Sequence, residues 1–105
     1  MNLSLARVPA ALAAGLCGLL CTPAATAAEP PAKAVQCFQC HGKDGIGLGP
    51  DFPNLAGQKA TYLTKALRDF RSGKRQDEVM SLMAKPLTDA EITQLAEYYE
   101  SLGTK

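Results

Sequence analysis

The sequence is poor in residues that many functional sites need. It has no tryptophan, a single histidine and only 6% aromatic residues among 105 positions. One histidine excludes every site that requires two imidazoles. The 11 basic residues are balanced by 10 acidic ones, so the chain lacks the excess of positive charge that typically binds nucleic acid. We therefore expect no nucleic-acid partner. A chain of this length is expected to form one domain.

Long hydrophobic runs are also scarce, and the one that is present lies at the N-terminus. Arg7 is the single charged residue in this first block, and Val8–Cys21 is uncharged and mostly apolar. The small residues Ala25-Thr26-Ala27 follow it, as they do at a signal-peptidase site. Residues 1–28 therefore predict a secretory signal peptide that is cleaved after Ala27 or Ala28.

Two other interpretations of this block are a membrane anchor and a lipoprotein signal. A retained anchor needs about 20 consecutive apolar residues, and Val8–Cys21 is shorter than that. Lipoprotein processing at Cys17 or Cys21 would require a small residue before the cysteine, whereas leucine precedes both. Cleavage is the favoured interpretation, and we expect residues 29–105 to be exported to the periplasm without a membrane segment.

The exported part, 29–105, is expected to be an all-α domain. We predict a first helix over 32–40, a strongly amphipathic helix over 58–72 and a last helix that ends at Gly103. Thr88 and Glu91 form the capping-box pattern that begins the last helix. Residues 42–57 and 73–86 are predicted to be two long loops. So small a domain has a marginal core and usually needs a disulfide, a metal or a cofactor.

The chemistry is concentrated in Cys37-Phe38-Gln39-Cys40-His41. This is the C-x-x-C-H pattern by which haem c is attached. Two thiols three positions apart on one helical turn can each form a thioether with a haem vinyl group. The adjacent histidine can then supply the proximal iron ligand. We therefore predict one covalent haem c, held by Cys37 and Cys40, with His41 on the iron.

Three simpler interpretations of the motif fit less well. A structural zinc site needs four ligands, and 29–105 offers only Cys37, Cys40 and His41. A thiol–disulfide oxidoreductase normally carries its C-x-x-C near a βαβ pattern, which is missing here. An ordinary structural disulfide between the two cysteines is the third alternative.

The sixth iron ligand follows in part by elimination. No second histidine exists, which leaves a methionine thioether, a lysine, a water or an open position. Methionine is favoured, and 29–105 contains two, Met80 and Met83, either of which also suits core packing. From the apolar faces of the predicted helices, we expect six side chains to line the haem pocket: Phe38, Phe52, Leu55, Leu63, Leu67 and Tyr99.

A resemblance to a known family rests on three segments: CFQCHGKDG, DFPNLAGQKATYL and MSLMAKPLTDAEITQLAEYY. Through them the chain from Cys37 to Leu102 resembles small class I cytochromes c, particularly cytochrome c553 and the single-haem halves of cytochrome c4. The resemblance implies that fold, with about three main helices and two long loops around one covalent haem. It also implies that Met80 rather than Met83 is the axial ligand, and that the Pro50 carbonyl accepts the second N–H of His41.

The function that this implies is electron transfer rather than catalysis. We expect a monomeric periplasmic carrier that moves single electrons between transient redox partners, namely a quinol-oxidising complex or dehydrogenase and a terminal oxidase or reductase. One alternative is a cytochrome subunit held permanently in an oxidoreductase complex. A less favoured alternative is a haem sensor with an open sixth position.

Overall fold

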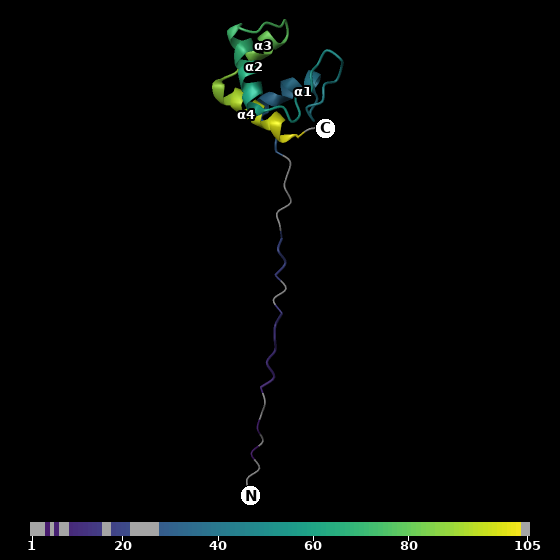
Figure 1. Ribbon diagram of the computed structural model, residues 1–105, viewed down its shortest axis with the longest axis vertical. Coiled ribbons are helices and arrows are strands. Elements are labelled where there is room, and N and C mark those ends of the chain that lie inside the picture. The colour runs from purple at the N-terminus through teal and green to yellow at the C-terminus, as the bar shows by residue number, and fades with distance from the viewer. Residues whose placement is uncertain (1–3, 5, 7–8, 16–17, 22–27, 104–105) are drawn as a thin grey trace.

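The computed structural model describes residues 4, 6, 9–15, 18–21 and 28–103. These residues contain helices and no strand (Figure 1). The elements are, in chain order, the 3₁₀ turn η1 (Ala32–Ala34), α1 (Val35–His41), α2 (Ala60–Ser72), α3 (Met80–Ala84) and α4 (Asp89–Ser101). No helix in this described part is long and apolar enough to cross a membrane. The all-α prediction is confirmed.

The N-terminal block contributes little to the fold that is described. Its described residues, within 4–21, form no helix and lead away from the helical body (Figure 1). Arg7, Cys17 and 22–27, on which the signal-peptide interpretation depends, lie outside the described residues. That interpretation remains a prediction.

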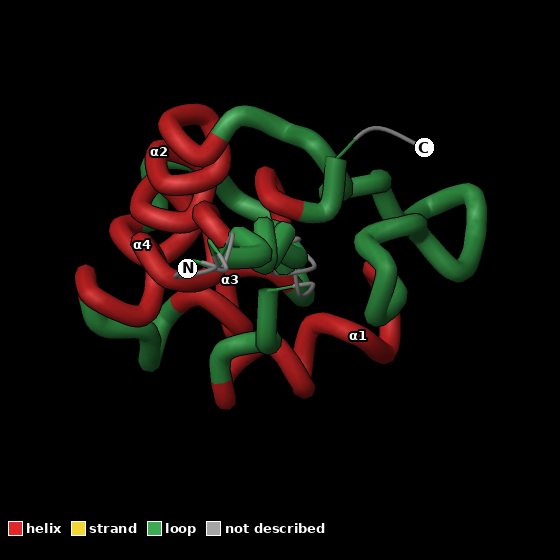
Figure 2. The backbone as a smooth tube through the Cα atoms, turned by 90° about the horizontal axis from the view of Figure 1, so that it is seen from below, coloured by secondary structure: helices red, strands yellow, loops and turns green. Residues whose placement is uncertain are grey.

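The helical body is built around the packing of α2 on α4, which is its most extensive helix pair (Figure 2). In α2, Leu63 and Phe70 lie seven positions apart, which is two helical turns, so both point to the same side. In α4, Ile92 and Leu95 are at most 2% exposed and form the centre of the core. η1 closes the core on α4 through Ala34, whose small side chain is fully buried.

Helix α3 lies within 73–86, a segment that the sequence predicts to be entirely loop. It has five residues, too few for hydrophobic periodicity to be visible in the sequence. Its first turn is instead made by the carboxylate of Asp77, which accepts the backbone N–H groups of Val79 and Met80 at 2.9 and 2.8 Å. The described part of the domain therefore contains this short helix in addition to the three main helices that the sequence predicts.

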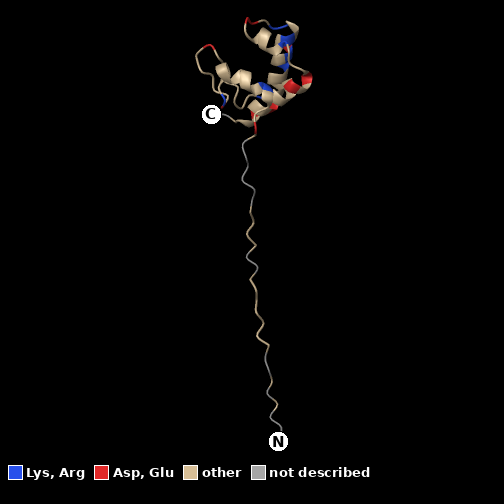
Figure 3. Ribbon diagram, turned by 180° about the vertical axis from the view of Figure 1, so that it is seen from behind, with Lys and Arg blue, Asp and Glu red and all other residues tan. Residues whose placement is uncertain are grey.

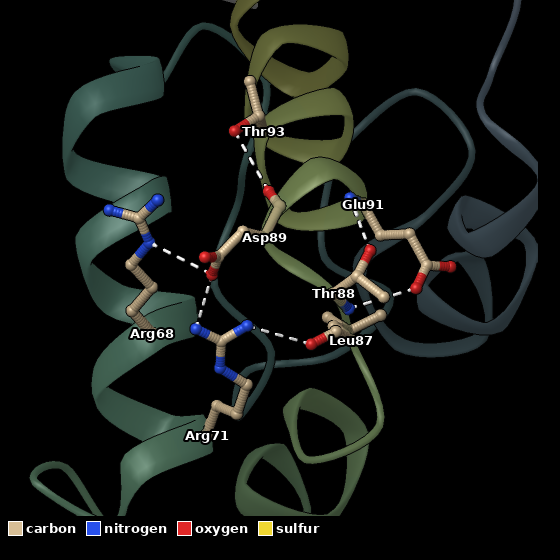
Figure 4. A network of polar contacts seen from close by, with 7 residues as sticks. All are labelled: Arg68, Arg71, Leu87, Thr88, Asp89, Glu91 and Thr93. Carbon is tan, nitrogen blue, oxygen red and sulfur yellow. Dashed lines mark hydrogen bonds and ion pairs between the residues drawn. The ribbon is translucent and has the colours of Figure 1, made fainter.

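A polar network fastens the start of α4 to α2 (Figure 4). Arg71 donates to the Leu87 carbonyl at 3.0 Å and to Asp89 at 2.6 Å. The Arg71 guanidinium lowers the pKa of the Asp89 carboxyl below its ordinary value. The predicted capping box is confirmed, because Thr88 and Glu91 exchange two hydrogen bonds of 3.1 Å.

The first long loop, 42–57, folds back tightly on itself beside α1 and projects from the body (Figure 2). Gly42 ends α1 with φ +76°, and a Cβ there would lie 2.3 Å from the Ile46 carbonyl oxygen. Gly47 donates its N–H to the Asn54 side chain at 2.8 Å. This close folding brings Pro53 of the loop next to His41 at the end of α1.

Candidate functional site

A cavity of about 540 Å³ lies among α1, the segment 51–58, α2, α3 and α4. Its size falls in the range of ligand pockets, roughly 300–1,000 Å³. Cys37, Cys40, His41, Met80 and Met83 all line it, although the chain places them on two separate helices. A second, shallower hollow of about 700 Å³ lies between residues 28–30 and the 42–48 loop and contains none of these side chains.

The two cysteines project from a single helix. Cys37 and Cys40 lie three positions apart in α1, are half-buried and form no disulfide. Burial raises the pKa of the Cys37 thiol above its ordinary value. Both sulfur atoms are therefore available on one wall of the cavity.

His41 ends α1 and is 7% exposed. Its Nδ1–H donates to the backbone carbonyl of Pro53 at 2.8 Å. A carbonyl can only accept, so this contact places the ring proton on Nδ1 and leaves the Nε2 lone pair free to bind a metal.

The carbonyl partner of His41 corrects the expectation, which named Pro50. Pro50 lies at the exposed tip of the loop. The loop doubles back after Gly49, whose carbonyl accepts the Phe52 N–H at 3.1 Å, and this reversal brings Pro53 to the imidazole instead. Two prolines so close in the sequence are not distinguishable by motif alone.

The two methionines differ in burial. Met80 and Met83 both belong to α3 and both line the cavity. Met80 is half-buried and packs on the core cluster, whereas Met83 is 37% exposed.

Five of the six predicted wall residues line the cavity, namely Phe52, Leu55, Leu63, Leu67 and Tyr99. Phe38 is the exception, because it points to the other side of α1 and packs near Tyr98, with ring centroids 6.4 Å apart. The Tyr99 hydroxyl is buried and has no hydrogen-bond partner among the described residues. It lies beside the Cys37 thiol, and burial raises the pKa of this hydroxyl well above its ordinary value.

Two charged residues, Arg75 and Asp77, also line the wall, and sequence reasoning did not identify Asp77. The Arg75 guanidinium lies over the Phe70 ring, 4.6 Å from its centroid. Neither residue belongs to a local motif, and only the return of the 73–79 segment along α2 brings them to the cavity. Elsewhere, residues of both charge signs are mixed over the helical body (Figure 3).

The donor set of the cavity fits a haem. Two free thiols three positions apart suit two thioether bonds, and His41 has a free Nε2 beside thioether side chains from α3. The walls are mostly apolar, as a large flat macrocycle requires. No group of three His, Cys, Asp or Glu side chains able to hold a metal ion is found among the described residues.

The fold and the site together define a small all-helical haem protein. Residues 31–103 match the family model described as Cytochrome c. The chain belongs to the cytochrome c family, and its resemblance to class I cytochromes c is confirmed. The cofactor of this family is haem c, attached covalently, and the members are electron carriers.

Three relatives show how far the similarity extends. The chain is 43% identical over 81 residues to cytochrome c-554(548) of Halomonas halodenitrificans, covering 74% of this chain and 98% of that protein. It is 48% identical over 81 residues to the thiosulfate dehydrogenase electron acceptor of Thiomonas intermedia, covering 76% and 37%. It is 41% identical over 90 residues to cytochrome c4 of Pseudomonas aeruginosa, covering 86% and 44%.

A solved structure agrees with these relatives. The cytochrome c4 structure of Acidithiobacillus ferrooxidans has a TM-score of 0.59 and 41% identity, covering 70% of this chain and 40% of that one. The chain thus spans less than half the length of these two cytochromes c4 and of the thiosulfate dehydrogenase electron acceptor, and nearly all of cytochrome c-554(548).

Proposed function

We propose that this protein is a monohaem electron carrier in which Cys37 and Cys40 would hold haem c, and His41 and Met80 would bind its iron. The observation that carries the proposal is the convergence of these four side chains on one cavity. Bound haem supplies one-electron exchange between ferrous and ferric iron.

The residues around the site support this role. Pro53 holds the His41 ring in the tautomer that a ligand needs and raises its basicity. The apolar walls exclude water, which disfavours the additional positive charge of the ferric state. A thioether ligand favours ferrous iron, so both effects raise the reduction potential. A haem iron held by both His41 and Met80 would have no open position for oxygen or peroxide.

The partners and the cellular location are part of the same proposal. Two relatives are named thiosulfate dehydrogenase electron acceptor, which favours a dehydrogenase of inorganic sulfur compounds as one electron donor. Export by residues 1–28 would place the domain of residues 29–105 in the periplasm, where bacterial c-type cytochromes typically operate. Contacts between small redox proteins are weak and bury little surface, so we expect transient binding of a monomer.

A redox-titrated optical spectrum of the holoprotein tests the proposal. Methionine-ligated ferric haem shows a weak far-red sulfur-to-iron charge-transfer band. Met80→Ala is expected to abolish this band and lower the potential, whereas Met83→Ala is the matched control that retains it. Loss of the band in Met83→Ala alone would assign the ligand to Met83. A wild-type protein that lacks the band and binds carbon monoxide readily would overturn the carrier function.

The covalent attachment has its own test. Mass spectrometry of denatured protein is expected to show the mass of one haem on the wild type. The double variant Cys37→Ser/Cys40→Ser is expected to lose it. Haem that stays covalently bound in that variant would contradict the assignment of the two thioethers.

A further inference from the structure

The turn that precedes Met80 is held by one carboxylate. Oδ1 of Asp77 accepts the backbone N–H groups of both Val79 and Met80, at 2.9 and 2.8 Å. The Asp77 N–H donates in return to the Ser81 hydroxyl at 3.1 Å. Asp77 thus lies just before α3, and its Oδ1 atom accepts the N–H of Met80, the first residue of that helix.

Few other contacts fix this end of the helix. α3 has only five residues, and a helix so short is not stable on its own in water. Among the described helices, α3 contacts α2 alone. The hydrogen bonds of Asp77 therefore act together with the packing on α2 to orient its first turn.

The cap acts on Met80 rather than on Met83. The Met83 N–H is bonded within the helix, to the Val79 carbonyl at 3.0 Å, and its side chain is 37% exposed. The Met80 N–H has no carbonyl of a preceding turn to bond, as at every helix start, and takes the carboxylate of Asp77 instead. Fixing this amide restricts the backbone of Met80, and a helical backbone leaves its side chain few directions.

We propose that Asp77 is a positioning residue that keeps the Met80 thioether in the cavity and so resists its displacement from the iron. This inference rests on the ligation by His41 and Met80 proposed above. When Met80 leaves the cavity through a movement of its backbone, the 77–80 turn rearranges and both hydrogen bonds to Asp77 break. The cap therefore adds its free energy to the ligated state.

The test is titration of the ferric holoprotein with imidazole, which competes for the sixth position and removes the far-red band. Asp77→Ala is expected to raise the apparent affinity for imidazole by about fivefold to tenfold, the equilibrium equivalent of one lost cap. Asp77→Asn keeps an acceptor oxygen at the same place and is expected to restore nearly the wild-type affinity.

Thr88→Ala is the matched control, because it removes the cap of α4, a helix that carries no methionine. It is expected to lower the thermal midpoint about as much as Asp77→Ala while leaving the affinity for imidazole unchanged. Equal affinities in wild type and Asp77→Ala, with the band intact in both, would overturn the role of Asp77 alone. A wild-type spectrum without the band would instead contradict the proposed methionine ligation.

Discussion

The imidazole of His41 and the carbonyl of Pro53 are joined by a hydrogen bond of 2.8 Å, across twelve positions of the chain. This bond sets the tautomer of the one histidine in the sequence. It also ties the end of α1 to the 42–57 loop, so the conformation of that loop determines the orientation and tautomer of the His41 ring. The loop is therefore expected to be sensitive to small changes.

Gly47 lies against the backbone of Phe52 within this loop. A Cβ at residue 47 would lie 1.9 Å from the Phe52 carbonyl oxygen, next to Pro53. Gly47→Ala is expected to destabilise the holoprotein by about 1–3 kcal/mol, measured by urea unfolding, because the backbone must move apart. Gly49→Ala is the control, since its Cβ would be at an ordinary 3.5 Å from the Phe52 ring. Equal unfolding curves for the two variants would contradict this packing.

Ile92 lies at the centre of the core and is fully buried. Ile92→Ala should lower the free energy of unfolding by about 2–5 kcal/mol, because it leaves a cavity in the core. Ile92→Val removes a single methylene group and leaves a smaller cavity, so it should lower the free energy of unfolding by only about 0.5–1.5 kcal/mol. Leu82→Ala, at a residue that is 67% exposed, is expected to change it by less than about 0.5 kcal/mol. Similar losses for Ile92→Ala and Leu82→Ala would disprove this assignment of the core.

Arg71 and Arg68 both approach Asp89 but are not equivalent. Arg71 donates to a backbone carbonyl and to the carboxylate, whereas the ion pair of Arg68 is longer, at 3.7 Å (Figure 4). Arg71→Ala is expected to lower the free energy of unfolding by about 1 kcal/mol more than Arg68→Ala, because it leaves the Leu87 carbonyl without its hydrogen-bond donor. Chemical denaturation of the two variants measures this difference, and a larger loss for Arg68→Ala would contradict it.

The same network predicts a loss of stability in acid. Arg71 lowers the pKa of Asp89 in the folded chain below its ordinary 3.8, so the unfolded chain binds protons first as the pH falls. The stabilisation is therefore complete above that value and is lost as the pH falls through the folded pKa. Between about pH 5 and about pH 3, the free energy of unfolding should fall less steeply for Asp89→Asn than for wild type. Parallel curves would show that Asp89 does not contribute.

Local patterns in the sequence predicted the features that depend on neighbouring residues. The α2 helix and the capping box of α4 follow from periodicity and from residue types three positions apart, and both are confirmed. Phe38 shows where such reasoning stops. It was expected in the haem pocket, but periodicity assigns a side chain to a helix face and does not say what that face contacts.

The short helix α3 shows the same limit from the other side. Five residues are too few to show helical periodicity, and Asp77, although it is a residue type that commonly caps a helix start, is not followed by an amphipathic run. Its capping contacts become visible only when the turn is formed. The difference between Met80 and Met83 in burial likewise comes from how α3 lies on α2.

The sequence by itself determined the chemistry of this protein, because Cys37, Cys40 and His41 are close along the chain and their spacing is what haem attachment requires. Tertiary structure alone decided what surrounds them. It brought Pro53 rather than Pro50 to the histidine, and it placed α3 on the same cavity as α1. These choices depend on loop reversal and helix packing, which sum many weak contacts between distant residues and leave no local pattern in the sequence.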